Sequence, residues 1–253
     1  MALLVAIGFI TAVAAAIRST WSPCGQSVLS QITPFGERAR GHRFGATATG
    51  YILGALVGGA SLGIVAAALA AGVAALDLST AARLGLVAVL ALLGALVDAH
   101  LLGFGPPFIR RQLNEDWLPQ YRPWVYGAGF GWQIGSAFST YVMTAAVFLL
   151  VGVAALTASP LVALVVCVLF ALVRGLAVLL AVRCQTPDAL VAFFRRFVAL
   201  GPASRSFAIA AQVGVAIVAA GAAWGAVRAA VVAVGTGATV LAARVRPTPA
   251  ASS

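Results

Sequence analysis

The chain has 253 residues, of which 62% are hydrophobic and 9% are charged, and its mean hydropathy is +1.05. Soluble domains carry about 25% charged residues, so this composition excludes a soluble globular protein and predicts a membrane-embedded one. The net charge is +10, and every basic residue is an arginine. The arginines form short clusters between apolar runs, which favours topology control and contact with anionic headgroups over a nucleic-acid-binding face.

Six apolar runs reach the length of about 20 residues that a helix needs to cross a bilayer. The expected spans cover residues 2–31, 46–76, 84–104, 125–156, 161–182 and 206–227. A shorter run at 229–243 is either a surface segment or a seventh span, and residues 244–253 are expected to form a disordered tail. We therefore expect an all-α polytopic membrane protein with a single transmembrane domain over residues 1–243.

Arginine accumulates in alternate loops, namely the first, the third and the fifth. The positive-inside rule makes that side cytoplasmic and places the N-terminus outside. Lysine is absent, which with the Ala, Val, Gly and Leu content suggests a GC-rich genome, and we expect the plasma membrane of a prokaryote. Arg244 and Arg246 agree with this orientation in a seven-span protein and oppose it in a six-span one, so both counts stay open.

A weak internal repeat relates the second span to the fifth. Residues 51–59 align with residues 167–175, and five positions match in each segment: Leu53, Ala55, Leu56, Val57 and Gly59 with Leu169, Ala171, Leu172, Val173 and Gly175. The same offset places span 1 on span 4 and span 3 on span 6. Three spans per half make the halves inverted in the membrane, an architecture that recurs in transporters with a site near the midplane.

Span 1 is interrupted at Ser22, Pro23, Cys24, Gly25 and Gln26. Proline removes a main-chain donor and disfavours helix at the preceding residue, and nearby hydroxyl groups can satisfy the carbonyls that this releases. One interpretation is a proline kink with a packed cysteine. The other is a substrate, ion or thiol site at a discontinuous helix, lined by Ser22, Pro23, Cys24 and Gln26.

Charged side chains fall within or beside the apolar runs at Arg18, Asp98, His100 and Arg174. A charge at the bilayer centre costs about 2.5–3.5 kcal/mol on insertion scales, so such groups normally face the bundle interior and pair. We expect Asp98 to pair with Arg174 or with Arg18, either as a clamp between helices or as part of a substrate path. An alternative for Arg18 is that its side chain snorkels to the membrane interface. An alternative for His100 is that it lies at that interface.

Span 4 combines small and polar residues. Its glycines allow close helix approach, and the spacing of Gln133, Ser136, Thr140 and Thr144 predicts one polar stripe along a helix. The stripe is either a set of interhelical hydrogen bonds or the wall of a translocation path.

The loop at residues 105–124 combines prolines, arginines and aromatics, which suits anchoring at the headgroup level or docking of a protein partner. The sequence contains no cluster with metal-ligand spacing, no phosphate-binding loop and no Ser-His-Asp arrangement. We therefore expect no enzyme, no metal and no cofactor.

The Trp-Ser-Pro-Cys break at Cys24, followed by a basic loop and a Gly-rich second span, resembles the CcdA/DsbD-type transmembrane electron carriers of the lysine-exporter-like superfamily. The resemblance implies six spans in two inverted halves, with a proline-flanked cysteine in spans 1 and 4. It also implies that two cysteines pass reducing power outward from a cytoplasmic thioredoxin-like partner. Here Cys24 takes the first position, and the second half has Ser139 and Thr140 at the repeat-offset position instead of Pro-Cys.

This departure separates three hypotheses. A thiol relay needs a second sulfur, which Cys167 supplies only if span 5 brings it within bonding reach of Cys24; Cys184 lies near the boundary of the span. The leading hypothesis is a transporter-like protein that kept the scaffold, with the electrostatics set by Arg18, Asp98 and Arg174 and favouring an anion. The alternatives are an electron carrier and a non-transporting assembly factor that acts through residues 105–124.

Overall fold

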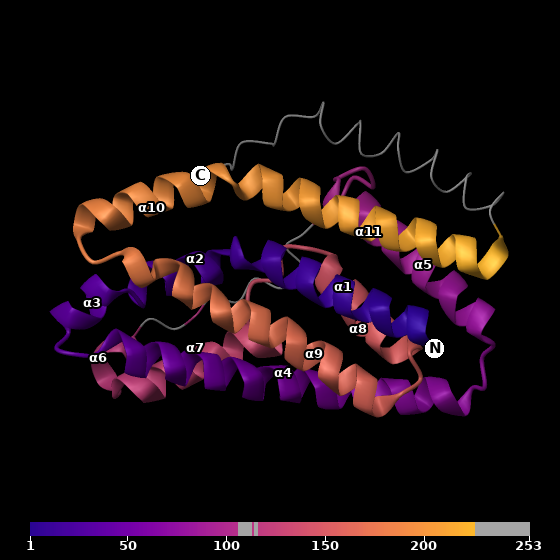
Figure 1. Cartoon of the computed structure of the whole chain (residues 1–253), viewed down its shortest axis with the longest axis horizontal. Helices are drawn as coiled ribbons and strands as arrows, with labels where there is room; N and C mark the ends of the chain where they lie inside the picture. The colour runs from indigo at the N-terminus through magenta and orange to yellow at the C-terminus, as the bar shows by residue number, and fades with distance from the viewer. Residues whose placement is uncertain (106–112, 114–115, 226–253) are drawn as a thin grey trace.

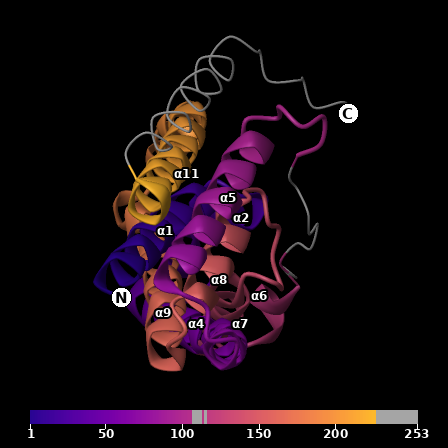
Figure 2. The ribbon, with the colours of Figure 1, turned by 90° about the vertical axis from the view of Figure 1, so that its right-hand side faces the viewer.

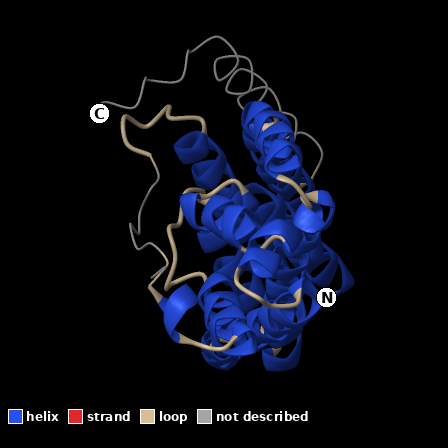
Figure 3. Cartoon of the chain, turned by 90° about the vertical axis from the view of Figure 1, so that its left-hand side faces the viewer, coloured by secondary structure: helices blue, strands red, loops and turns tan. Residues whose placement is uncertain are grey.

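The computed structural model describes residues 1–105, 113 and 116–225, and over these residues it contains helices and loops without strands. Figure 3 shows this all-helical architecture, which confirms the expected fold class. The proposed seventh segment at 229–243, the tail at 244–253 and most of the loop at 105–116 lie outside the described residues.

The first half of the chain forms five helices. They are α1 (Ala2–Thr20), α2 (Pro23–Gln31), α3 (Pro34–Ala39), α4 (Phe44–Ala75) and α5 (Thr80–Asp98). The second half forms α6 (Trp117–Gln120), α7 (Pro123–Ser136), α8 (Ala146–Leu156), α9 (Pro160–Leu176), the 3-10 helix η1 (Ala177–Arg183), α10 (Pro187–Ala199) and α11 (Gly201–Trp224). Residues that we expected in the fifth loop thus form α10.

Five helices of the described part are long and apolar enough to cross a membrane, when α9 is counted with η1 and α10 with α11. The run that we expected as span 4 is divided between α7 and the shorter, 11-residue apolar helix α8. The chain is therefore a multi-pass membrane protein, and the runs expected as its first and fourth spans are each divided between two helices.

The two interruptions have different local causes. At the first, Pro23 begins α2 and the Ser22 hydroxyl accepts a hydrogen bond from the Gly25 amide at 3.2 Å, so serine caps the new helix. At the second, no proline is present; Ala137 takes a φ of 63°, a left-handed conformation that ends α7. The Phe138 amide then donates to the Ser136 carbonyl at 2.8 Å.

Corresponding elements of the two halves run in opposite directions. In Figure 1, α1 runs toward the end of the bundle that carries α3 and α6, whereas α7 and α8 run away from it; α4 and α9 oppose each other in the same way, as do α5 and α11. Figure 2 shows α5 with α11 on one side of the bundle and α4 with α7 and α9 on the other, with α1 and α8 between them.

The contact between α4 and α9 repeats itself about a two-fold axis. Gly59 of α4 packs against Ala171 of α9, and Gly175 of α9 packs against Ala55 of α4. These are the positions that the sequence repeat aligns, Ala55 with Ala171 and Gly59 with Gly175. A two-fold relation requires such reciprocal contacts, so the alignment reflects the fold.

Glycines bring α4 and α7 into main-chain contact. A Cβ atom on Gly54 would collide with the Ala128 carbonyl, and one on Gly131 would collide with the Tyr51 carbonyl. Gly58, Gly127 and Gly135 are equally close to the facing main chain. Such spacing of small residues lets membrane helices approach closely, which confirms the expectation for span 4.

The Gly131→Ala substitution should destabilise the bundle, because the added methyl group must push α4 away from α7. Overpacking of this kind costs about 1–3 kcal/mol, which should lower the midpoint of thermal unfolding in detergent. The matched control is Gly214→Ala in α11, where a Cβ meets no atom within 4 Å. Equal melting midpoints for the two variants would contradict this packing.

Candidate functional site

The two interrupted spans meet at Cys24. This residue lies in the first turn of α2, it is 1% exposed, and its Sγ atom accepts a hydrogen bond from the Tyr141 amide at 3.5 Å. Tyr141 belongs to the irregular segment between α7 and α8. The residue before it, Thr140, holds the position that the internal repeat pairs with Cys24, so the two breaks lie side by side across the two-fold relation.

Arg174 joins the ends of two half-helices at this junction. Its guanidinium group is 3% exposed, and it donates from Nη1 to the Ile134 carbonyl at 2.7 Å and from Nη2 to the Ser19 carbonyl at 3.4 Å. These carbonyls lie in the last turns of α7 and α1. Each helix C-terminus carries the equivalent of about half a negative charge, so two ends together offset about one positive charge. The Phe170 ring, 5.5 Å away, adds a cation–π contact.

A small cavity borders Arg174. Thr20, Gly25, Tyr51 and Arg174 supply its polar or main-chain surface, and apolar residues of α2, α7 and η1 complete it. The Nε atom of Arg174 is buried and has no hydrogen-bond partner among the described residues. The cavity has room for about one water-sized molecule.

Asp98 caps the N-terminus of α8. Its carboxylate accepts hydrogen bonds from the Thr144 hydroxyl at 2.6 Å, the Ala145 amide at 2.8 Å and the Gln212 side chain at 2.8 Å. A carboxylate at a helix N-terminus is stabilised by the main-chain amides and the helix dipole. The expected ion pair with Arg18 or Arg174 is therefore wrong in the described structure, because Asp98 is satisfied by the end of α8 and by α11.

Arg18 fastens α1 to the start of α11. It donates to the Ser204 hydroxyl at 2.9 Å and to the Gly201 carbonyl at 3.3 Å. The neighbouring Trp21 extends this contact to α10, since its ring stacks on Phe197 at 4.6 Å and its Nε1 atom donates to the Phe197 carbonyl at 2.7 Å. Arg18 and Arg174 therefore share none of these hydrogen-bond partners, although we expected both to line one substrate path.

The polar stripe expected along span 4 is not continuous, because α7 ends at Ser136. Thr144 binds Asp98, whereas the Ser136 hydroxyl donates to the Gln133 carbonyl at 3.0 Å and the Thr140 hydroxyl to the Ala137 carbonyl at 3.2 Å. These last two bonds satisfy carbonyls at the end of α7. Gln26 acts in the same local way at the first break, where its side chain donates to the Trp21 carbonyl at 2.9 Å.

The cysteines occupy separate packing clusters. Cys24 packs with residues of α4 and α7, Cys167 with residues of α1, α8 and α9, and Cys184 with α2 and α10. None of the three forms a disulfide in the described part of the chain. Burial also raises the pKa of the Cys184 thiol, which disfavours its reactive thiolate form.

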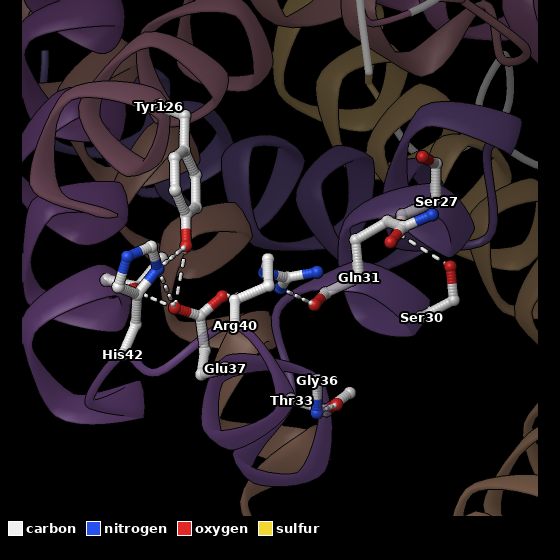
Figure 4. Close-up of polar contacts among 10 residues, drawn as sticks. Ser27, Ser30, Gln31, Thr33, Gly36, Glu37, Arg40, His42 and Tyr126 are labelled. Carbon is white, nitrogen blue, oxygen red and sulfur yellow. Dashed lines mark hydrogen bonds and ion pairs between the residues drawn. The ribbon is translucent and has the colours of Figure 1, made fainter. Parts of the chain in front are cut away.

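A buried carboxylate that the sequence analysis did not single out lies in α3 (Figure 4). Glu37 is fully buried and accepts hydrogen bonds from Tyr126 at 2.7 Å, Thr47 at 2.5 Å and Arg40 at 2.6 Å. His42 lies 3.3 Å from the Tyr126 hydroxyl. This Glu37 cluster ties α3 to α4 and α7. The Thr-Pro start of α3 signals a short helix, but no local pattern reveals its distant partners.

The loop at 105–124 is described at residues 105, 113 and 116–124. There Trp117 stacks on Phe130 of α7 with ring centroids 6.1 Å apart, and Leu113 and Leu118 are buried against the same cluster. The rest of the partner surface that we expected here, at 106–112 and 114–115, lies outside the described residues.

The chain is similar to the methylamine utilization protein MauF of Paracoccus versutus, with 31% identity over 170 residues that make up 67% of this chain and 62% of that relative. It is also similar to MauF of Paracoccus denitrificans, with 35% identity over 170 residues, or 66% and 60% of the two chains. The chain thus spans about three fifths of the length of these curated relatives. No family model and no solved structure matches it. The finer resemblance to CcdA/DsbD-type carriers stays a proposal.

If Cys24 lies beside the second break, a cysteine at Thr140 should form a disulfide with it. We expect Thr140→Cys, made in a chain with Cys167→Ser and Cys184→Ser, to lose both free thiols on mild oxidation and regain them on reduction. Thiol labelling followed by mass spectrometry measures this.

The matched control is Phe138→Cys in the same background, because Phe138 belongs to the same break and its side chain is exposed. Equal crosslinking of the two variants, or two labelled thiols in oxidised Thr140→Cys, would place the breaks apart.

Proposed function

We propose that this chain is a transporter-like membrane protein that serves methylamine utilisation and moves a small solute through the junction of its two interrupted spans. The observation that carries the proposal is the shared position of both breaks, with Cys24 against Tyr141 and Arg174 bound to the ends of α1 and α7. The methylamine role is carried over from the name of the MauF relatives, which this chain matches over about two thirds of its own length.

Interrupted helices suit solute binding for a physical reason. A continuous membrane helix satisfies all its main-chain groups internally, whereas a break leaves amides and carbonyls available near the midplane. Two inverted halves can also exchange their conformations, which opens the same site to either side in turn. The reciprocal contacts of α4 and α9 support such a pair of halves.

The proposal includes an orientation. Arg38, Arg40, Arg43 and Arg183 gather at the end of the bundle that carries α3 and η1, and we assign this end to the cytoplasm by the positive-inside rule. Met1 lies at the opposite end in Figure 1, so the N-terminus is assigned to the outside, in the plasma membrane of a prokaryote.

A second candidate is a thiol–disulfide electron carrier with a thioredoxin-like partner, favoured by the placement of Cys24 beside the repeat-related residue. A relay of this type requires a second sulfur to resolve the mixed disulfide. Threonine holds that position here, and Cys167 packs in another cluster. The arrangement therefore supports the transporter-like function better.

Expression of this chain in a Paracoccus denitrificans strain that lacks MauF should restore growth on methylamine, measured against growth on succinate. We expect Cys24→Ser to restore growth as well as the unchanged chain, because the proposed role needs no redox step. Arg174→Gln should fail, whereas the matched control Arg183→Gln, at an exposed arginine of η1, should succeed.

The outcomes separate the candidates. Loss of growth with Cys24→Ser, at unchanged protein level, supports the electron carrier instead. A well-expressed unchanged chain that does not restore growth removes the methylamine role.

A further inference from the structure

We infer that the cavity beside Arg174 binds a small monovalent anion, an inference that names the substrate class of the proposed transporter and so rests on that function. The charged group that lines the cavity is a guanidinium with an unused donor. Nη1 and Nη2 of Arg174 are occupied by the Ile134 and Ser19 carbonyls, but the buried Nε–H has no acceptor. A buried donor without an acceptor costs free energy, and a bound anion removes this cost.

The charge distribution favours an anion on this side. No carboxylate forms an ion pair with Arg174 among the described residues, since Asp98 binds α8 and Glu37 binds Arg40. The first turn of the nine-residue helix α2, whose N-terminus carries about half a positive charge, also borders the cavity through Gly25.

Gly25 allows this helix end to approach. A Cβ atom at Gly25 would collide with the Thr20 carbonyl, so glycine lets the first turn of α2 fold tightly against the end of α1. Main chain rather than side chain therefore forms this wall of the cavity. The Gly25 amide itself donates to the Ser22 hydroxyl, so this helix end contributes its dipole to the cavity rather than that amide.

Tyr51 lines the cavity from α4 and lies close enough to Arg174 to interact with it electrostatically. A phenol hydroxyl is a hydrogen-bond donor to an anion. The room for about one water-sized molecule sets the size of the ligand, which favours a monatomic anion such as chloride and excludes sulfate and phosphate. The size of the cavity and the charge of Arg174 thus both favour a small monovalent anion.

The test uses the full chain in nanodiscs of neutral lipid. Thermal unfolding is followed against increasing sodium chloride, with sodium gluconate holding the ionic strength constant and sulfate as a size control. A ligand of the native state raises the melting temperature in a saturable way. We expect saturation with chloride and none with gluconate or sulfate.

Arg174→Gln should raise the apparent Kd about ten- to hundredfold, the range expected for loss of a charge-assisted hydrogen bond. Tyr51→Phe keeps the ring in its packing and should weaken anion binding severalfold. If Arg174→Gln does not fold, the Kd of Tyr51→Phe is the test of the site. Arg183→Gln is the control and should leave the Kd unchanged.

An absent anion effect in the unchanged chain overturns the inference, as does an equal effect with sulfate or an unchanged Kd in both site variants. The growth assay separates this from the proposed function. If growth is restored but no anion binds, the inference of an anion site is wrong and the proposed function stands. If an anion binds but growth is not restored, the anion site stands and the methylamine role is wrong.

Discussion

The guanidinium group of Arg174 links the ends of two interrupted helices. Inside a bilayer no water is available for unpaired carbonyls, so an interrupted span is stable only where protein groups replace it. Arg174 donates to the Ile134 carbonyl in the last turn of α7, and it is a second donor to the Ser19 carbonyl of α1, which also accepts from the Ser22 amide at 3.1 Å. One cation therefore interacts with the C-terminal ends of both helices.

The opposite ends of the same breaks are satisfied by acceptors. Ser22 caps α2 from within the chain, and Asp98 caps α8 from the end of α5. Donors therefore meet C-termini and acceptors meet N-termini, as helix dipoles favour. Arg174 and Asp98 both bind the ends of interrupted helices, and the cavity beside Arg174 is where we infer that an anion binds.

Much of the scaffold could be predicted from the sequence. The long apolar runs predict the spans, Pro23 predicts the first break, and the alignment of Gly59 with Gly175 predicts two related halves. These signals are local or periodic. The second break could not be found in this way, because it depends on Ala137 in a left-handed conformation and on Asp98, a distant residue. The same holds for Glu37, whose partners Thr47 and Tyr126 come from other helices.

Only some residues of the candidate site could be singled out from the sequence. Cys24 and Arg174 stood out because a proline-flanked thiol and a mid-span arginine are unusual in apolar helices. Their neighbours were not evident: Asp98 was expected to pair with an arginine and instead caps α8, and Thr140 was expected on a helical stripe that α7 does not continue. Side-chain partners in a bundle are set by three-dimensional packing, which periodicity along one helix does not encode.

The central claim is that the junction of the two breaks opens to both sides of the membrane. The most direct measurement is labelling of Cys24 by a membrane-impermeant maleimide in vesicles of either orientation, with Cys167→Ser and Cys184→Ser leaving it as the remaining cysteine. Alternating access predicts slow labelling from both sides, and reduced labelling from both when chloride is added. Labelling from one side alone, or from neither in a folded protein, would contradict the account.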